Sequence, residues 1–221
     1  MERMITVLTL AIGPDFRKAL GPALESKKAW CERHGYTYIQ GGEEYWDRSR
    51  PIAWSKVAFV LDQLGRLPEG ALVFLSDADV LITNPALRLE DLVVPLLPAE
   101  KDLLMTIDAC AHINSGNMLM RNGVWLRDWW RRLDKQTELT YHIWWENAAM
   151  IKLLETVPDD LAHTEISTEH WKFNAYLQGL PGQKLWEPGA LLVHFAGVYD
   201  LRKMEQLQKE ILAGGTPRIT L

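Results

Sequence analysis

Two aspartates one residue apart, Asp77 and Asp79, directly follow an apolar run that begins at Ala71. The run has the length of a strand, contains β-branched and aromatic residues, and precedes another apolar segment at 80–82, so it predicts a buried strand. Two carboxylates at the end of a buried strand repel each other and lose hydration unless a cation or hydrogen-bond donors compensate. Because Mg²⁺ and Mn²⁺ prefer carboxylate oxygens, the segment favours a metal site. The alternative is a loop in which one aspartate caps a turn and the other lies in water.

The elements before this pair alternate between strands and helices, which predicts a parallel sheet with right-handed crossovers. The predicted strands span 5–12, 36–39 and 71–77, and the predicted helices span 15–33 and 54–67. Gly21-Pro22 is expected to kink or split the first helix, and Gly35 supplies the left-handed residue that ends it. In such a sheet, ligands bind at the carboxyl ends of central strands, which is where Asp77 and Asp79 lie.

The second half of the chain adds elements to the same predicted α/β domain. Strands are predicted at 102–107 and 190–195, and helices at 124–135, 146–155 and 201–212. We also predict a polar loop at 112–117, an extended aromatic segment at 171–176, and a helix cap at Asn122. No repeat, low-complexity tract or linker interrupts the sequence, so residues 1–221 are predicted to form one domain.

The composition excludes several classes of protein. Apolar residues make up 48% and charged residues 24% of the chain, as in ordinary globular proteins. The net charge of −5 argues against nucleic acid as a partner, since no basic run neutralises a phosphate backbone. Two cysteines form neither a disulfide framework nor a zinc site by themselves, which favours a reducing compartment. No apolar run approaches the ~20 residues of a membrane span, so we predict no integral membrane segment.

Several short motifs in this sequence occur together, in the same order, in a known family of enzymes. The motifs are His34-Gly35-Tyr36, Trp54-x-Lys56, Leu75-Ser76-Asp77-Ala78-Asp79, Asn114-Ser115-Gly116-Asn117-Met118-Leu119-Met120-Arg121-Asn122-x-x-Trp125, Glu146-Asn147-x-Ala149 and His194-Phe195-x-Gly197. In this order and spacing they resemble the galactosyl-, mannosyl- and xylosyltransferases of glycosyltransferase family thirty-four. The resemblance runs from about residue 6 to residue 197, which is most of the chain.

The resemblance implies a GT-A fold, a single Rossmann-like α/β domain that binds a nucleotide-sugar. It also implies Mn²⁺ or Mg²⁺ as the cofactor, and transfer with retention from a UDP-sugar or GDP-mannose to a glycan or another hydroxyl acceptor. Asp77, Ala78 and Asp79 match the positions that bind metal and donor, and His194 matches the histidine that completes the metal shell near the diphosphate, with Gly197 on the donor side. Asn114, Ser115 and Gly116 match the segment that lines the donor-sugar and acceptor side. Glu146 and Asn147 match the pair beside the reacting carbon.

The sequence departs from the family pattern at three points. Asn147 stands where the family usually has a longer glutamine. Some members place a basic residue just after H-F-x-G, whereas Val198 and Tyr199 follow here, leaving Arg202 or Lys203 as substitutes. The membrane anchor of the eukaryotic members is missing, which suggests a bacterial or viral member that works in the cytoplasm.

The chemistry of such a transfer suggests a role for each residue. Asp79 and His194 follow strands whose ends meet at one edge, so we expect both to bind the cation while Asp77 contacts the donor or a metal-bound water. Glu146 is expected to stabilise a positively charged sugar carbon, although a carboxylate at a helix N-terminus is also favoured by the helix dipole. Lys56 is either a partner of a phosphate or carboxylate, or a solvated lysine. His194 has a second interpretation as a structural histidine at a strand end.

Other candidates lie at predicted strand ends and in aromatic clusters. Thr9, Ala11 and Gly13 end the first strand, where small residues allow a nucleotide to approach the backbone. Asp108 ends another strand and either binds donor-sugar hydroxyls or caps a turn. The ten tryptophans include Trp144, Trp145 and Trp171, which offer flat faces for an acceptor sugar, although most tryptophans in a protein belong to the core.

Two other functions remain open. A D-x-D at a strand end also resembles phosphatases of the haloacid dehalogenase type, but these place it after the first strand with a threonine two residues on, where Leu81 stands here. The other is a lectin-like module that binds sugars through an ion and the tryptophans, without turnover.

Overall fold

A six-stranded sheet forms the centre of the computed structural model, which describes residues 5–219. Its strands, in the order β2-β1-β3-β6-β5-β7, are β1 Ile5–Leu10, β2 Thr37–Gly41, β3 Leu72–Ser76, β5 Leu103–Ile107, β6 Ile113–Arg121 and β7 Thr164–Ser167. All of them run in one direction except β6, which is antiparallel to both neighbours, β3 and β5. The predicted α/β fold with a mostly parallel sheet is therefore confirmed.

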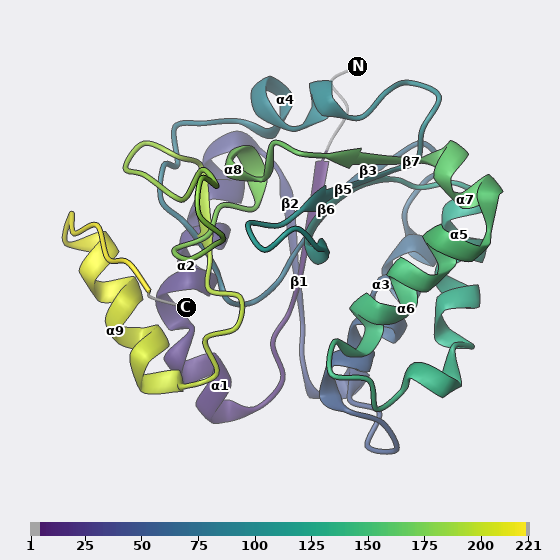
Figure 1. Cartoon of the computed structure of the whole chain (residues 1–221), viewed down its shortest axis with the longest axis horizontal. Helices are drawn as coiled ribbons and strands as arrows, with labels where there is room; N and C mark the ends of the chain where they lie inside the picture. Colours follow the sequence, from purple (N-terminus) through teal and green to yellow (C-terminus); the bar gives the residue numbers. More distant parts are fainter. Residues whose placement is uncertain (1–4, 220–221) are drawn as a thin grey trace.

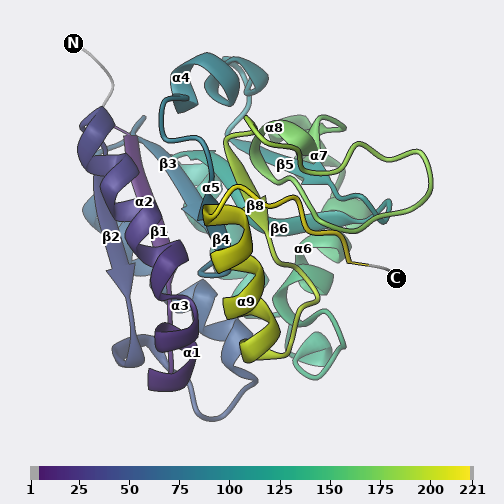
Figure 2. The same ribbon diagram turned by 90° about the vertical axis from the view of Figure 1, so that its left-hand side faces the viewer.

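Helices cover both faces of this sheet (Figures 1 and 2). On one face lie α1 Pro14–Ala19, α2 Gly21–His34 and α9 Leu201–Leu212; on the other lie α3 Ser55–Arg66, α5 Val124–Asp134, α6 Trp145–Thr156 and α7 Pro158–His163. Short helices in the connections are α4 Leu89–Leu92, α8 His170–Phe173, and the 3₁₀ turns η1 Glu43–Tyr45, η2 Ile52–Trp54, η3 Val94–Leu96 and η4 Thr137–Leu139. Helix 15–33 is split as predicted, and Gly35 ends it at φ 72°.

The core is built by the alternation of side chains along the strands. In β3, Val73 and Leu75 pack with α3, α5 and α6, whereas Leu72 and Phe74 pack on the opposite face with Trp30 of α2. This alternation is the period of two that a strand imposes, and it explains why the run before Asp77 is apolar throughout.

A second, two-stranded sheet brings a distant segment to the end of β3. It consists of β4 Val80–Ile82 and β8 Leu192–His194, which pair antiparallel with Val80 opposite His194. Asp77 and Asp79 occupy the short link between β3 and β4. The pairing therefore places His194 beside Asp79.

Residues 112–117 and 171–173 differ from their predicted conformations. The first segment, predicted as a loop, mostly belongs to β6 because its backbone pairs with β5 and β3, with Asn117 opposite Ser76. The second, predicted to be extended, belongs to α8, in which the buried residues His170 and Phe173 have helical spacing. Polar residues in 113–117 thus mark the end of a strand that borders a cavity, not a loop.

Asn122 caps a different helix from the one predicted. Helix α5 begins after Gly123 without a side-chain cap. The Asn122 Nδ2 instead donates to the carbonyl oxygens of Leu64 and Leu67, at 3.0 and 2.9 Å. It thereby satisfies carbonyls at the C-terminal end of α3.

An ion pair between α5 and α7 provides a test of this packing. Arg132 donates twice to the fully buried Asp160, at 2.8 and 2.6 Å. We expect Arg132→Met to cost about 3 kcal/mol, because it leaves a buried carboxylate unpaired. Asp160→Asn should cost less, since Arg132 still reaches water and Asp128. Urea unfolding measures both, with Lys152→Met in an exposed pair as the control. Equal losses in the two α5–α7 variants would contradict this account.

None of the helices between residues 5 and 219 combines the length and the apolar character that a membrane span requires.

Candidate functional site

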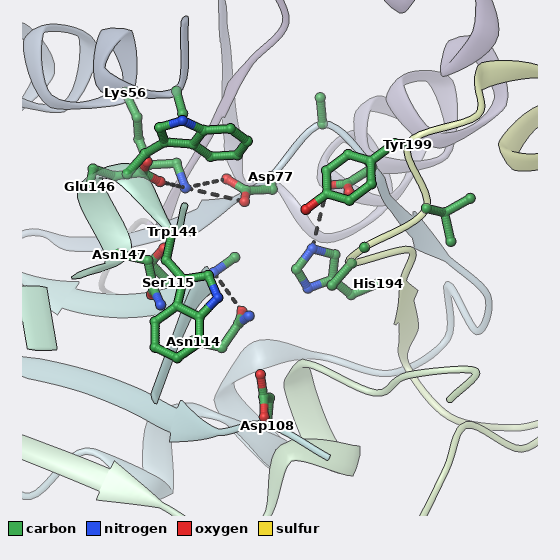
Figure 3. A pocket seen from close by; sticks show the side chains of 18 of the residues that line it. Lys56, Asp77, Asp108, Asn114, Ser115, Trp144, Glu146, Asn147, His194 and Tyr199 are labelled. Carbon is green, nitrogen blue, oxygen red and sulfur yellow. Dashed lines mark hydrogen bonds and ion pairs between the residues drawn. The ribbon is translucent and has the colours of Figure 1, made fainter. Parts of the chain in front are cut away.

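A cavity of about 780 Å³ opens where the link between β3 and β4 meets β6, α6 and β8 (Figure 3). Most residues predicted as functional from the sequence line it: Lys56, Asp77, Ala78, Asp79, Asp108, Asn114, Ser115, Gly116, Glu146, Asn147, His194 and Gly197. They come from segments that are far apart in sequence. The sheet pairings described above are what bring them together.

Asp77, Asp79 and His194 form a cluster of three ligand groups. One oxygen of each carboxylate and one imidazole nitrogen all lie within 4.8 Å of one another. The His194 Nε2 is 3.5 Å from Asp79 Oδ1. Burial alone would raise the pKa of Asp79, but the adjacent His194 outweighs this effect and lowers the pKa. This spacing suits a single ion bound between two carboxylates and an imidazole.

The other ring nitrogen of His194 is held by a residue that the sequence analysis did not identify. His194 Nδ1 lies 2.8 Å from Asn174 Oδ1, which also accepts from Asn117 Nδ2 at 2.8 Å. Asn174 Nδ2 in turn donates to Asn114 Oδ1 at 3.0 Å. Because an amide oxygen only accepts, Nδ1 donates this bond, and Nε2 is the ring nitrogen that faces the aspartates. Nothing in the sequence around Asn174 indicated this role.

Lys56 connects the aspartates to the opposite wall of the cavity. Its Nζ lies 2.9 Å from Asp77 Oδ1 and 2.8 Å from Glu146 Oε1. Burial alone would lower the pKa of Lys56, but these two carboxylates outweigh it and raise the pKa. Burial also raises the pKa of Glu146, although Lys56 opposes this effect. Lys56 is therefore not a solvated lysine.

Two buried acceptor atoms on this wall lack a hydrogen-bond partner among residues 5–219. They are Oε2 of Glu146, a residue only 4% exposed, and Oδ1 of Asn147, whose Nδ2 donates to Ile113 O at 3.0 Å. Buried acceptors of this kind are costly unless a ligand supplies donors. Sugar hydroxyls are donors that suit both atoms.

A second lysine, Lys27 of α2, lies behind the aspartates and was also missed. It is fully buried, and its ammonium group donates to the carbonyl oxygens of Asp77 and Ala78. Burial lowers the pKa of Lys27 to about 7, although the carboxylates of Asp79 and Asp77 oppose it. The sequence did contain a signal, because Lys27 lies on the apolar stripe of α2 between Ala23 and Cys31.

Asp108 closes the turn between β5 and β6. Its Oδ1 accepts from the backbone nitrogens of Cys110 and His112, at 2.8 and 3.0 Å. Within this turn, Ala111 has a φ of 67°, an unfavourable conformation for a residue other than glycine. Asp108 thus has the turn-capping role that was one of its two interpretations, and it also lines the cavity.

The residues predicted at the end of the first strand do not line the cavity. Thr9 is fully buried and donates to Ser76 O at 2.9 Å, and the Gly13 nitrogen donates to Glu43. Ala11 is also fully buried, and its backbone nitrogen bonds to Gly41 O. The nearby residues that do line the cavity are Leu10, Ile12 and Phe16. This end of the cavity is apolar.

The other residues that the sequence suggested for ligand binding lie either in the cavity lining or elsewhere on the surface. Trp144 and Trp145 line the cavity, whereas Trp171 lies on a separate surface pocket. Arg202 and Lys203 are exposed on α9 and are not among the lining residues. Among the described residues, Lys56 is the only lysine or arginine in the lining, against four carboxylates: Asp77, Asp79, Asp108 and Glu146.

Comparison with known proteins identifies relatives of this chain. The model of the galactosyl transferase GMA12/MNN10 family matches residues 4–97. The probable alpha-1,2-galactosyltransferase gmh2 of Schizosaccharomyces pombe is 25% identical over 207 residues, covering 74% of this chain and 56% of the relative. A second alpha-1,2-galactosyltransferase of that yeast, itself uncharacterised, is 24% identical over 212 residues, covering 80% and 55%. The chain thus spans about half the length of these relatives.

Solved structures share the fold at lower sequence identity. A glycosyltransferase involved in glycosylation of the major capsid of PBCV-1 has a TM-score of 0.72 and 15% identity, covering 93% of this chain and 98% of that one. The glycosyltransferase GlyE of Streptococcus pneumoniae TIGR4 has a TM-score of 0.57 and 13% identity, covering 100% and 66%. The chain therefore has the GT-A fold that its motifs predicted, and its residues 4–97 resemble the galactosyl transferase GMA12/MNN10 family.

Proposed function

We propose that this chain is a glycosyltransferase that requires a divalent cation. It transfers a sugar from a UDP-sugar or GDP-mannose to a hydroxyl group of a glycan or another acceptor, with retention at the anomeric carbon. The observation that carries the proposal is the cluster of Asp77, Asp79 and His194, within 4.8 Å, in a cavity lined by four carboxylates and one lysine.

The donor set fits Mn²⁺ or Mg²⁺. Asp77 and Asp79 offer carboxylate oxygens, and His194 offers an Nε2 that its bond to Asn174 leaves free to accept. An imidazole together with carboxylates suits Mn²⁺ better than the all-oxygen preference of Mg²⁺. When bound, such a cation acts as a Lewis acid that neutralises the departing diphosphate.

The charge of the cavity supports a requirement for the cation. A nucleoside diphosphate is an anion, and the lining carboxylates Asp77, Asp79, Asp108 and Glu146 repel it. Lys56 is engaged by two of these carboxylates and does not offset that repulsion by itself. Removal of the divalent ion is therefore expected to abolish donor binding rather than weaken it slightly.

In this proposal, Glu146 and Asn147 contact the donor sugar. Lys56 occupies one Glu146 oxygen and fixes the carboxylate, while Oε2 has no partner among the described residues. We assign this oxygen to electrostatic stabilisation of the positive charge that develops at the sugar carbon, as opposed to nucleophilic attack. Asn147 Oδ1 is similarly free to accept from a sugar hydroxyl. A trapped covalent sugar on Glu146 would contradict the electrostatic role.

The relatives indicate which donor to test first. Those in Schizosaccharomyces pombe carry names of alpha-1,2-galactosyltransferases, so galactose is the first candidate for the transferred sugar. UDP-galactose, UDP-glucose, UDP-xylose and GDP-mannose form the full panel.

Release of nucleoside diphosphate from this panel tests the proposal. We expect at least one donor to be hydrolysed with Mn²⁺ or Mg²⁺ and none with EDTA, and we expect the first-formed sugar to keep the donor's anomeric configuration by NMR. Asp79→Ala should remove this activity. Binding of sugars without turnover would instead favour the lectin-like interpretation, and turnover that persists in EDTA would contradict the metal requirement.

A further inference from the structure

Trp144 is an exposed aromatic residue on the wall of the cavity. It is 41% exposed although it lines the cavity, and the adjacent Ile143 is 74% exposed. In Figure 3, Trp144 enters from the same side as Glu146 and Asn147, while His194 and Tyr199 enter from the opposite side. Exposed apolar surface at the mouth of a cavity marks a place where a ligand binds.

The indole ring is held in place despite its exposure. The rings of His112 and His142 lie 4.8 and 5.7 Å from it, centroid to centroid. The Trp144 backbone nitrogen also donates to His142 Nδ1 at 3.1 Å. A ring fixed by two neighbours loses little conformational entropy when a ligand stacks on it.

The backbone on both sides of this contact is strained. Trp145 has a φ of 44°, and Ala111, next to His112, has a φ of 67°; both values are unfavourable for residues with a side chain. At Trp145 the chain turns into α6 and directs Glu146 toward Lys56. Strain of this kind persists where the surrounding structure imposes it, often at binding sites.

We infer that Trp144 is the platform on which a pyranose ring of the acceptor stacks. This inference rests on the proposed function. The diphosphate belongs with Asp77, Asp79 and His194, and the donor sugar with the buried acceptors of Glu146 and Asn147. Trp144 lies at the solvent-accessible mouth, where an acceptor can arrive after the donor has bound.

The chemistry around the indole favours a sugar over a lipid chain or an aromatic alcohol. A pyranose ring presents apolar C–H groups to an aromatic face and hydroxyls at its edge. The polar residues that line the cavity include His112, which contacts the indole, together with Asp108 and Asn114, and these suit hydroxyls. An alkyl chain would remove water from these polar groups without offering them a hydrogen bond.

Acceptor kinetics of Trp144→Ala and Trp144→Phe test this inference. The acceptors are methyl glycosides of mannose, galactose and glucose, assayed with the donor that the chain hydrolyses. Trp144→Ala is expected to raise the acceptor KM on the order of tenfold, more than it changes the donor KM, because stacking is lost. Trp144→Phe should restore part of the loss. The control is Trp46→Ala, since Trp46 is 38% exposed and lies outside the cavity lining.

The outcomes separate the inference from the proposed function. An unchanged acceptor KM in Trp144→Ala overturns the platform, as does a chain that hydrolyses donor but glycosylates none of the three glycosides. A chain that turns over no nucleotide-sugar at all overturns the proposed function, and the inference with it.

Discussion

Gly116→Ala is expected to lower the affinity for Mn²⁺ by roughly 10- to 100-fold, the usual cost of disturbing a residue that orients a metal ligand. A Cβ at position 116 would lie 2.7 Å from His194 Nδ1 and closer still to Cε1. The β4–β8 pairing holds the backbone of His194, so the imidazole can yield only by giving up the bond between Nδ1 and Asn174. The added methyl group is therefore expected to displace the ring and to change the position of Nε2 relative to Asp77 and Asp79.

Calorimetric titration of Mn²⁺ and metal-dependent donor turnover both measure this effect. Gly65→Ala is the matched control, since a Cβ there meets nothing within 4 Å. A double variant sharpens the test: once His194→Ala has removed the ring, Gly116→Ala should cost nothing further. Additive losses in the double variant, or wild-type Mn²⁺ affinity in Gly116→Ala, would contradict this account.

The parallel strands of the sheet were predictable from local patterns in the sequence. Apolar runs of strand length marked β1 and β3, and the helices between them implied that the strands are parallel. Asp79 and His194 were expected to meet because both lie at strand ends, but what brings them together is the antiparallel β4–β8 pairing outside the main sheet. The parallel order of β1 and β3 needed only periodicity and connectivity.

Features that depend on contacts with segments far away in the sequence were not predictable. Residues 113–117 are polar, and their place in β6 comes from pairing with β3 and β5 rather than from their own pattern. Nor does any local feature identify β7 Thr164–Ser167 or the role of Asn174, because each depends on the element packed against it. Lys27 is different, since a lysine between Ala23 and Cys31 on an apolar stripe was a readable signal.

Lys56→Met is expected to lower donor turnover on the order of 10²-fold, because it releases Glu146, proposed to stabilise the sugar carbon, and Asp77, a proposed metal ligand. It should also cost about 3 kcal/mol in the free energy of unfolding, since Glu146 is left buried without its cation. Asp77 is more exposed than Glu146, so water compensates it after the loss of Lys56. The loss of unfolding free energy is therefore expected at the low end of the values for a broken buried ion pair. The control is Lys152→Met in an exposed pair.

The loss of stability in Lys56→Met depends on pH with a definite sign. Burial already raises the pKa of Glu146 above 4.5, and removing Lys56 raises it further. A carboxyl group with a raised pKa in the folded state adds stability that is complete below 4.5 and lost as pH rises through the folded-state value. In EDTA, the deficit relative to the wild type should therefore be larger at about pH 8 than at about pH 5.

The double variant Lys56→Met/Glu146→Gln separates charge from packing. If the deficit arises from the unpaired carboxylate, adding Glu146→Gln should recover part of it and reduce its pH dependence, with a coupling of about 0.5 to 3 kcal/mol. Turnover should not recover, because the charge that faces the sugar carbon is absent. Lost methylene packing around Lys56 predicts the opposite pattern, in which the deficits add and stay constant with pH. Urea unfolding at the two pH values distinguishes these results.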